Sequence, residues 1–184
     1  MSIHSLGEEQ CYSEIAGQCG DLFEYLKTLI TAELPPWEEH FGFLAKEVPN
    51  HWIEDDSILA AIHRVNPIAR IGILRVPPNT CYDWHRDTHR RCCVNMLISD
   101  DAESVTLFGA ESGGLQTRQI IPIEYKPRTF YLFNNQVDHC IINLGPERFT
   151  FSLYFAEERH FEVVKGKLEA AGILANNNKQ EELV

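Results

Sequence analysis

The chain has 184 residues, with 27 acidic against 16 basic side chains and a formal net charge of −11 at pH 7. A nucleic-acid surface or an anionic membrane needs clustered lysine and arginine, so this balance argues against both partners. Its apolar runs fall short of the ~20 residues that span a bilayer, and residues 1–20 lack the basic and apolar segments of a secretory leader. We therefore expect a cytoplasmic protein with no membrane partner, folded as one domain over residues 1–184.

The first third of the chain has the pattern of helices. Apolar side chains recur near helical spacing over residues 10–31, and Pro35 and Pro36 follow, where proline cannot continue a helix. Residues 37–51 fit a short helix or a loop, and residues 57–65 fit another helix. We expect residues 1–66 to form a mostly helical part that packs on the rest of the fold.

From residue 69 the pattern changes to short strands. Runs rich in β-branched and aromatic residues are separated by turns of proline, glycine and asparagine. The runs cover residues 69–76, 92–98, 104–108, 119–125, 129–133, 140–143 and 149–155. This spacing is typical of an antiparallel sandwich or jelly roll, so the expected class is mainly β with flanking helices. The barrel would cover residues 67–158, and residues 159–184 would form a C-terminal helix over 161–171 and a polar tail.

Two histidines and one aspartate are spaced as metal ligands. Side chains two apart on a strand share a face, so His85 and Asp87 would project together. His139 lies in or beside another strand-like run and can add a third ligand from across the fold. Two histidines and one carboxylate with open positions form the facial triad of non-haem Fe(II) oxygenases, so we predict an iron site at these residues. The alternative is a chance His-x-Asp and a structural histidine.

The last strand-like run begins with an arginine that can bind an anion. Arg148, Thr150 and Ser152 share one face of the run, and apolar side chains occupy the other face. A guanidinium matches a carboxylate in two hydrogen bonds, and a hydroxyl two residues on can donate a third. We predict that this face holds the carboxylate of a co-substrate. The alternative is a surface arginine paired with Glu147 or another acid.

Together these residues resemble the Fe(II)/2-oxoglutarate-dependent dioxygenase superfamily, whose signature is His-x-Asp, a distal histidine and Arg-x-Ser/Thr on the final strand. Residues 71–155 also look like the aspartyl/asparaginyl β-hydroxylase branch, most clearly over residues 130–139 and 143–148. The resemblance implies a double-stranded β-helix core, a jelly roll similar to that of cupins. It also implies that 2-oxoglutarate chelates the iron and that its far carboxylate binds Arg148 with Thr150 or Ser152.

The strand after the His-x-Asp departs from that branch. The branch often carries Arg-x-His there, whereas this chain reads RCCVN over residues 91–95. Arg91, Cys93 and Asn95 share a face, so Asn95 or Arg91 is a candidate contact for the near end of 2-oxoglutarate. A buried, satisfied amide is the alternative for Asn95. Some enzymes of the branch lack the ligating acid, so the presence of Asp87 favours the three-ligand site.

The resemblance implies an enzyme that uses Fe(II), 2-oxoglutarate and O2. It would hydroxylate a C–H bond of an amino-acid side chain, free or within a peptide, and release succinate and CO2. Beyond the metal ligands no acid or base residue is required for the C–H step. Two alternatives stay open: a cupin-type metalloenzyme that uses no 2-oxoglutarate, and a non-catalytic binding protein that retains the barrel.

Overall fold

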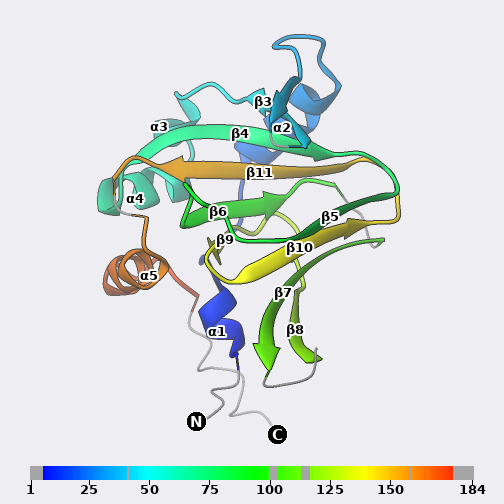
Figure 1. Ribbon diagram of the computed structural model, residues 1–184. Helices are drawn as coiled ribbons and strands as arrows, with labels where there is room; N and C mark the ends of the chain where they lie inside the picture. The colour runs from blue at the N-terminus through cyan, green and yellow to red at the C-terminus, as the bar shows by residue number, and fades with distance from the viewer. Residues whose placement is uncertain (1–5, 41, 100–102, 113–116, 158, 176–184) are drawn as a thin grey trace, which may run out of the picture.

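Two antiparallel sheets form the centre of the protein, as the computed structural model shows for residues 6–40, 42–99, 103–112, 117–157 and 159–175 (Figure 1). Over these described residues, the large sheet has the strand order β1-β9-β6-β11-β4-β3-β2, and the small sheet has the order β5-β10-β7-β8. The strands are β1 (Tyr12–Glu14), β2 (Glu38–His40), β3 (Phe43–Glu47), β4 (Ile68–Val76), β5 (Thr80–His85), β6 (Cys92–Leu97), β7 (Ser104–Ser112), β8 (Thr117–Ile123), β9 (Tyr131–Asn134), β10 (Asp138–Asn143) and β11 (Arg148–Phe155).

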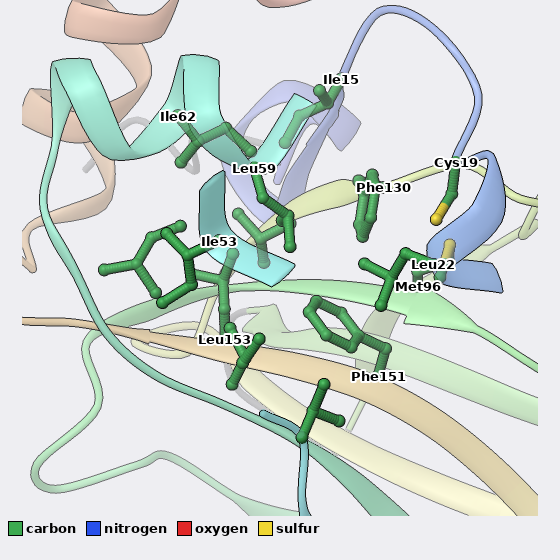
Figure 2. Close-up of a cluster of buried hydrophobic side chains, with 14 of the residues drawn as sticks. Ile15, Cys19, Leu22, Ile53, Leu59, Ile62, Met96, Phe130, Phe151 and Leu153 are labelled. Carbon is green, nitrogen blue, oxygen red and sulfur yellow. The ribbon is translucent and has the colours of Figure 1, made fainter. Parts of the chain in front are cut away.

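The helices are α1 (Glu8–Cys11), α2 (Asp21–Thr31), α3 (Trp52–Asp55), α4 (Ser57–Val65) and α5 (Phe161–Ala170). Side chains of α2, α3, α4 and α5 pack in the apolar cluster on the outer face of the large sheet, whereas Cys11 of α1 belongs to a smaller cluster. Figure 2 shows Leu59 and Ile62 of α4 above Phe151 and Leu153 of β11, within one buried apolar cluster. In the described parts of the chain, no helix is long and apolar enough to cross a membrane.

A smaller buried cluster joins the inner faces of the two sheets. It contains Phe133 of β9 in the large sheet and Phe108 of β7 in the small sheet, with their ring centroids 4.4 Å apart. The two faces of the large sheet therefore have different partners, helices on one side and the small sheet on the other. This confirms the expected class, mainly β with flanking helices and a double-stranded β-helix core.

Strand β11 shows how the sequence alternation produces this arrangement. Phe151, Leu153 and Phe155 belong to the helix-covered cluster, whereas Arg148 and Ser152 line the space between the sheets. Successive side chains on a strand point to opposite faces, so the apolar and polar sets separate along the strand up to a register shift between Tyr154 and Phe155. The strand is central in the sheet, between β4 and β6, which holds its polar face firmly in place.

The prediction of one helix over residues 10–31 is wrong in its first half. Residues Tyr12–Glu14 form β1, which pairs with β9, and the helix begins only at Asp21. Gly17 has a φ of +94°, a conformation that glycine adopts readily and that a helix excludes. Backbone pairing with the large sheet therefore wins over the helical spacing of the apolar side chains.

The N-terminal third also supplies two further strands that the sequence analysis did not expect. The segment predicted as a short helix or loop contains β2 and β3, and β3 pairs with β4 at the edge of the large sheet. Strand β5 was missed as well, because its sequence TCYDWH is largely polar and lacks a clear apolar alternation. It follows a turn in which Asn79 has a φ of +52°.

We expect the Phe151→Ala variant to lower the free energy of unfolding by about 3–5 kcal/mol, the usual cost of deleting a buried phenylalanine ring. Phe151 is fully buried and packs edge-on against Phe130, with ring centroids 5.6 Å apart. Urea unfolding followed by circular dichroism measures the change. The matched control is Val163→Ala on α5, where the side chain is 46% exposed and the change should stay within about 0.5 kcal/mol.

Candidate functional site

The three predicted metal ligands lie together between the sheets. One ligand atom from each of His85, Asp87 and His139 lies within 4.8 Å of the others. His85 ends β5 and pairs in register with His139 on the neighbouring strand β10. Asp87 lies just beyond the end of β5, so the expectation that it shares a strand with His85 is wrong, although the two side chains do converge.

Hydrogen bonds fix both imidazole rings with Nε2 turned to the centre. Nδ1 of His85 lies 2.7 Å from the carbonyl oxygen of Asp83, and Nδ1 of His139 lies 2.9 Å from that of Val137. A carbonyl oxygen can only accept, so each Nδ1 carries the proton and each Nε2 keeps its lone pair for a metal. The Nε2 atoms lie 3.5 Å and 4.0 Å from Oδ1 of Asp87.

The protonation states of His139 and Asp87 suit a metal centre. Burial lowers the pKa of His139 to about 4, so this imidazole is neutral at pH 7. Burial opposes the ionisation of Asp87, but the neighbouring His85 and the charge of Arg90 outweigh burial and hold its pKa below the usual range. A neutral imidazole and an ionised carboxylate are the forms that bind a metal.

The two oxygens of the Asp87 carboxylate have separate partners. Oδ1 faces the two imidazoles, whereas Oδ2 accepts hydrogen bonds from Nε of Arg90, at 2.9 Å, and from Nδ2 of Asn135. The carbonyl of Asn135 also accepts from the amide of Asp87 at 3.1 Å. This division leaves one oxygen for the metal and uses the other to fix the orientation of the carboxylate.

This donor set fits a divalent metal ion. Two nitrogen atoms and one carboxylate oxygen converge with their other polar atoms already bonded to the protein. Ligand atoms ~2.1 Å from a metal and at right angles to each other lie roughly 3 Å apart, slightly closer than the separations seen here. Two histidines and one carboxylate on one side of a metal leave the opposite side open to other ligands.

Asn135 and Arg90 are not among the site residues that the sequence predicts. Asn135 is only 1% exposed and its Oδ1 accepts from Sγ of Cys93 at 3.1 Å, so its amide is held on both sides. The signals in the sequence are weak. Arg90 lies three residues after Asp87, and Asn135 lies four residues before His139, in a turn that reads as an ordinary loop.

We expect the Asn135→Ala variant to bind a divalent metal roughly 10–100-fold more weakly, the usual effect of removing a partner that orients a ligand. Titration with Mn(II), followed by the electron paramagnetic resonance signal of the free ion, gives the affinity. The matched control is Asn134→Ala, because Asn134 is the neighbouring amide and donates instead to the carbonyl of Gln10 at 2.8 Å. Equal affinities in the two variants would contradict the role given to Asn135.

Arg148 lies deep between the sheets and is 1% exposed. Three hydroxyl groups accept its hydrogen bonds: Nη1 donates to Ser104 at 2.5 Å, Nη2 to Thr106 at 2.8 Å and Nε to Thr150 at 3.4 Å. Its guanidinium also lies 5.5 Å from the centroid of the Tyr125 ring. The alternative of a surface ion pair with Glu147 does not hold, because Arg148 is buried.

The other predicted co-substrate residues share the inner face with Arg148 but differ in their contacts. Thr150 contacts Arg148, whereas Ser152 accepts a hydrogen bond from Nη1 of Arg90 at 2.9 Å. Asn95 of β6 pairs with Ser152 in the sheet, and its Oδ1 lies 3.5 Å from Sγ of Cys93. All of these polar side chains are largely buried.

One cavity of about 800 Å³ connects the metal ligands to Arg148. Its lining includes the three ligands together with Asn95, Arg148, Thr150, Ser152 and Tyr125. Part of its wall comes from the N-terminal third, where β2 and β3 contribute His40, Phe43 and Lys46. A cavity of this size is typical of sites for small molecules.

Solved structures share this fold. An oxidoreductase of the 2OG-Fe(II) oxygenase family from Burkholderia pseudomallei is 11% identical in sequence. The match covers 74% of this chain and 78% of the oxidoreductase, with a TM-score of 0.54. A prolyl hydroxylase from Trichoplax adhaerens, in complex with a hypoxia inducible factor peptide, is 12% identical in sequence. The match covers 84% of this chain and 87% of the hydroxylase, with a TM-score of 0.59. The non-heme alpha ketoglutarate dependent epimerase SnoN, from nogalamycin biosynthesis, is 12% identical in sequence. The match covers 78% of this chain and 77% of the epimerase, with a TM-score of 0.51.

These similarities define the fold as one found in 2-oxoglutarate oxygenases. No protein-family model and no curated protein matches the sequence. The three structures differ in the reactions their names state, hydroxylation in one and epimerisation in another. The shared fold therefore does not determine the reaction, which depends on the residues of the site.

Proposed function

We propose that this protein is an Fe(II)- and 2-oxoglutarate-dependent dioxygenase that hydroxylates a C–H bond of an amino-acid side chain, free or within a peptide. The observation that supports this best is that one cavity is lined by both the His85, Asp87 and His139 cluster and the buried Arg148. A metal centre and a buried guanidinium in one enclosed space suit a ligand that has a metal-chelating end and a distal carboxylate.

In this proposal each residue has a defined task. His85, Asp87 and His139 hold the iron, and Arg90 and Asn135 keep the Asp87 carboxylate in its orientation. Arg148 and Thr150 bind the distal carboxylate of 2-oxoglutarate at the bottom of the cavity, and Asn95 and Ser152 line the space between that carboxylate and the metal. The iron and 2-oxoglutarate supply oxygen activation, with decarboxylation of 2-oxoglutarate to succinate and CO2.

Aromatic side chains beside the metal centre supply the protein's further contribution. Phe108 and Phe133 pack beside His139, with ring centroids 6.1 Å and 5.6 Å from its ring. These side chains exclude water from one side of the metal centre, which strengthens the charge interactions within the cavity. No side chain is assigned a proton transfer, because the reaction at the C–H bond requires none.

The choice of an amino-acid or peptide substrate rests on the cavity and on one of the similar structures. The wall formed by β2 and β3 lies at an exposed edge of the large sheet, where a ligand larger than 2-oxoglutarate has access. The prolyl hydroxylase from Trichoplax adhaerens binds a peptide on the same fold. We further propose that residues 1–184 act as one domain, because β1, β2 and β3 belong to the large sheet.

The conversion of 2-oxoglutarate to succinate tests the proposed function. Protein loaded with Fe(II) and incubated with 2-oxoglutarate and O2 should produce succinate above the level seen with Asp87→Ala, and nuclear magnetic resonance can follow the product directly. Peptides and amino acids that increase this rate would identify the substrate class. Iron binding without binding of 2-oxoglutarate would favour a cupin-type enzyme, and loss of both would favour a non-catalytic binding protein.

A further inference from the structure

Arg90 lies beside the metal centre and has a second partner on the opposite wall of the cavity. Its side chain is 26% exposed and lines the cavity. Nε donates to Oδ2 of Asp87 and Nη1 donates to Oγ of Ser152, both at 2.9 Å. The guanidinium therefore spans the distance between the metal ligand and strand β11.

The third nitrogen of the Arg90 guanidinium, Nη2, can donate to a ligand. Among the described residues, none accepts a hydrogen bond from its Nη2. Arg90 and Asp87 line the same cavity, and a guanidinium presents its donors in a fixed planar fork. A ligand that enters this region can reach both the metal and Arg90.

The charge balance around Arg90 depends on the metal. Without a metal ion, the Asp87 carboxylate is the partner that neutralises Arg90. A divalent cation on Oδ1 of Asp87 would take up that negative charge and leave the Arg90 charge uncompensated beside the metal. An enclosed positive charge is costly unless an anion joins it, so the loaded centre favours a ligand with a negative group at this place.

Groups from three other strands lie close to Arg90. Cys93 of β6 and Tyr154 of β11 lie near it, and burial raises the pKa of the Cys93 thiol. On the side of β2, burial lowers the pKa of His40, and the charges of Arg90 and Arg70 lower it further. In this part of the cavity the charge of Arg90 is paired with the Asp87 carboxylate, and two further acids, Glu38 and Glu39 of β2, line the wall.

The loop that carries Arg90 is also held in place. Arg159 donates from Nη1 to the carbonyl of His89 at 3.4 Å and from Nε to the carbonyl of Phe155 at 3.2 Å. Its guanidinium lies 4.4 Å from the centroid of the Tyr154 ring. These contacts join the loop to the end of β11, so little ordering is needed when a ligand binds.

We propose that Arg90 forms a second carboxylate subsite, beside the metal centre and separate from Arg148. This inference rests on the proposed function and deepens it, because it assigns two carboxylate groups to one cavity. The carboxylate comes from one of two sources: the group next to the keto carbon of 2-oxoglutarate, or a carboxylate of the substrate itself. The chemistry is the same in both cases, and two experiments separate them.

The first experiment compares two ligands on the Mn(II)-loaded protein without O2. 2-Oxoglutarate carries both carboxylates, whereas 4-oxopentanoate keeps the keto group and the distal carboxylate but lacks the near one. If the near carboxylate binds Arg90, Arg90→Gln should weaken binding of 2-oxoglutarate by about tenfold or more, the usual effect of losing a hydrogen bond between charged groups. Binding of 4-oxopentanoate should stay unchanged.

The second experiment tests a carboxylate of the substrate. N-acetylglycine is the probe, because it has a peptide group and one carboxylate, and N-acetylglycinamide is its neutral control. Mn(II) in the centre broadens the proton signals of a ligand bound nearby, so broadening reports binding at the site. If the substrate is the source, N-acetylglycine should show saturable broadening with wild-type protein, with or without 2-oxoglutarate, and lose it with Arg90→Gln.

Two control variants separate the subsite from damage to the metal centre. Asn135→Ala removes the other hydrogen bond to Oδ2 of Asp87 and leaves Arg90 in place, so it reports the effect of a disturbed carboxylate alone. Arg86→Gln removes a nearby arginine that is 63% exposed and paired with Asp138. All measurements use saturating Mn(II), and circular dichroism confirms folding.

The subsite assignment is wrong if Arg90→Gln changes neither 2-oxoglutarate nor N-acetylglycine binding beyond the effect of Asn135→Ala. It is supported if either ligand loses affinity in Arg90→Gln and keeps it in Arg86→Gln. A wild-type protein that binds Mn(II) but no 2-oxoglutarate would refute the proposed function instead. In that case the N-acetylglycine experiment still decides the subsite.

Discussion

Replacing His139 by alanine is expected to abolish binding of a divalent metal under conditions where the wild-type protein is saturated. His139 supplies one of three ligands, and its ring is held by the carbonyl of Val137 with Nε2 turned to the centre. Removing a direct ligand should lower the metal affinity by more than the roughly 10–100-fold that follows removal of a partner that only orients a ligand. Titration with Mn(II) measures the affinity, and formation of succinate should fall to background.

The controls for this variant address folding and the choice of ligand. His139 is 5% exposed, so His85→Ala, at a ring that is 28% exposed, gives a second test that disturbs the core less. His89→Ala is the matched control, because His89 also lines the cavity but is not in the ligand cluster. Full metal affinity in a folded His139→Ala variant, or its loss in His89→Ala, would show that the ligand set is wrong.

The second large effect is expected for Arg148→Lys. Lysine keeps the positive charge but cannot present two parallel donors to a carboxylate, so the geometry is lost while the charge stays. Breaking a buried, hydrogen-bonded charge pair costs roughly 2–5 kcal/mol, so the dissociation constant of 2-oxoglutarate should rise by roughly 30-fold or more. Mn(II) affinity should not change, because Arg148 does not contact the metal ligands.

Calorimetry without O2 measures both affinities in the same sample. Arg75→Lys is the matched control, because Arg75 lies on the neighbouring strand β4 and pairs with Glu147 rather than lining the cavity. An unchanged affinity for 2-oxoglutarate in Arg148→Lys would show that the distal carboxylate binds elsewhere. A parallel loss of Mn(II) affinity would point to a general disturbance of the barrel.

Sequence patterns could predict the parts of this fold that depend on local alternation. The final strand alternates polar and apolar residues without interruption, so its two faces follow directly from the period of a strand, and the helix over residues 57–65 follows from helical spacing. The N-terminal third could not be predicted in this way. Its strands are short, with polar or ambiguous sequences, and they form only because the large sheet offers an edge to pair with.

In the candidate site too, some residues can be predicted from the sequence and others only from the fold. The ligand residues His85, Asp87 and His139 were recognisable by residue type and spacing, and the structure brings them together. Asn135 was not recognisable, because its contact with Asp87 joins positions 48 residues apart and depends on how two loops meet. Arg90 is close to Asp87 in sequence, but only the fold shows that it reaches across the cavity.

Binding of 2-oxoglutarate to the Fe(II)-loaded protein in the absence of O2 is the most direct test. The chelated complex has a visible metal-to-ligand charge-transfer band, so a titration reports metal and co-substrate in one spectrum. We expect a band that saturates with 2-oxoglutarate, is absent in His139→Ala and requires a much higher concentration in Arg148→Lys. A folded, iron-loaded protein that shows neither this band nor calorimetric binding of 2-oxoglutarate would contradict the assignment as a 2-oxoglutarate oxygenase.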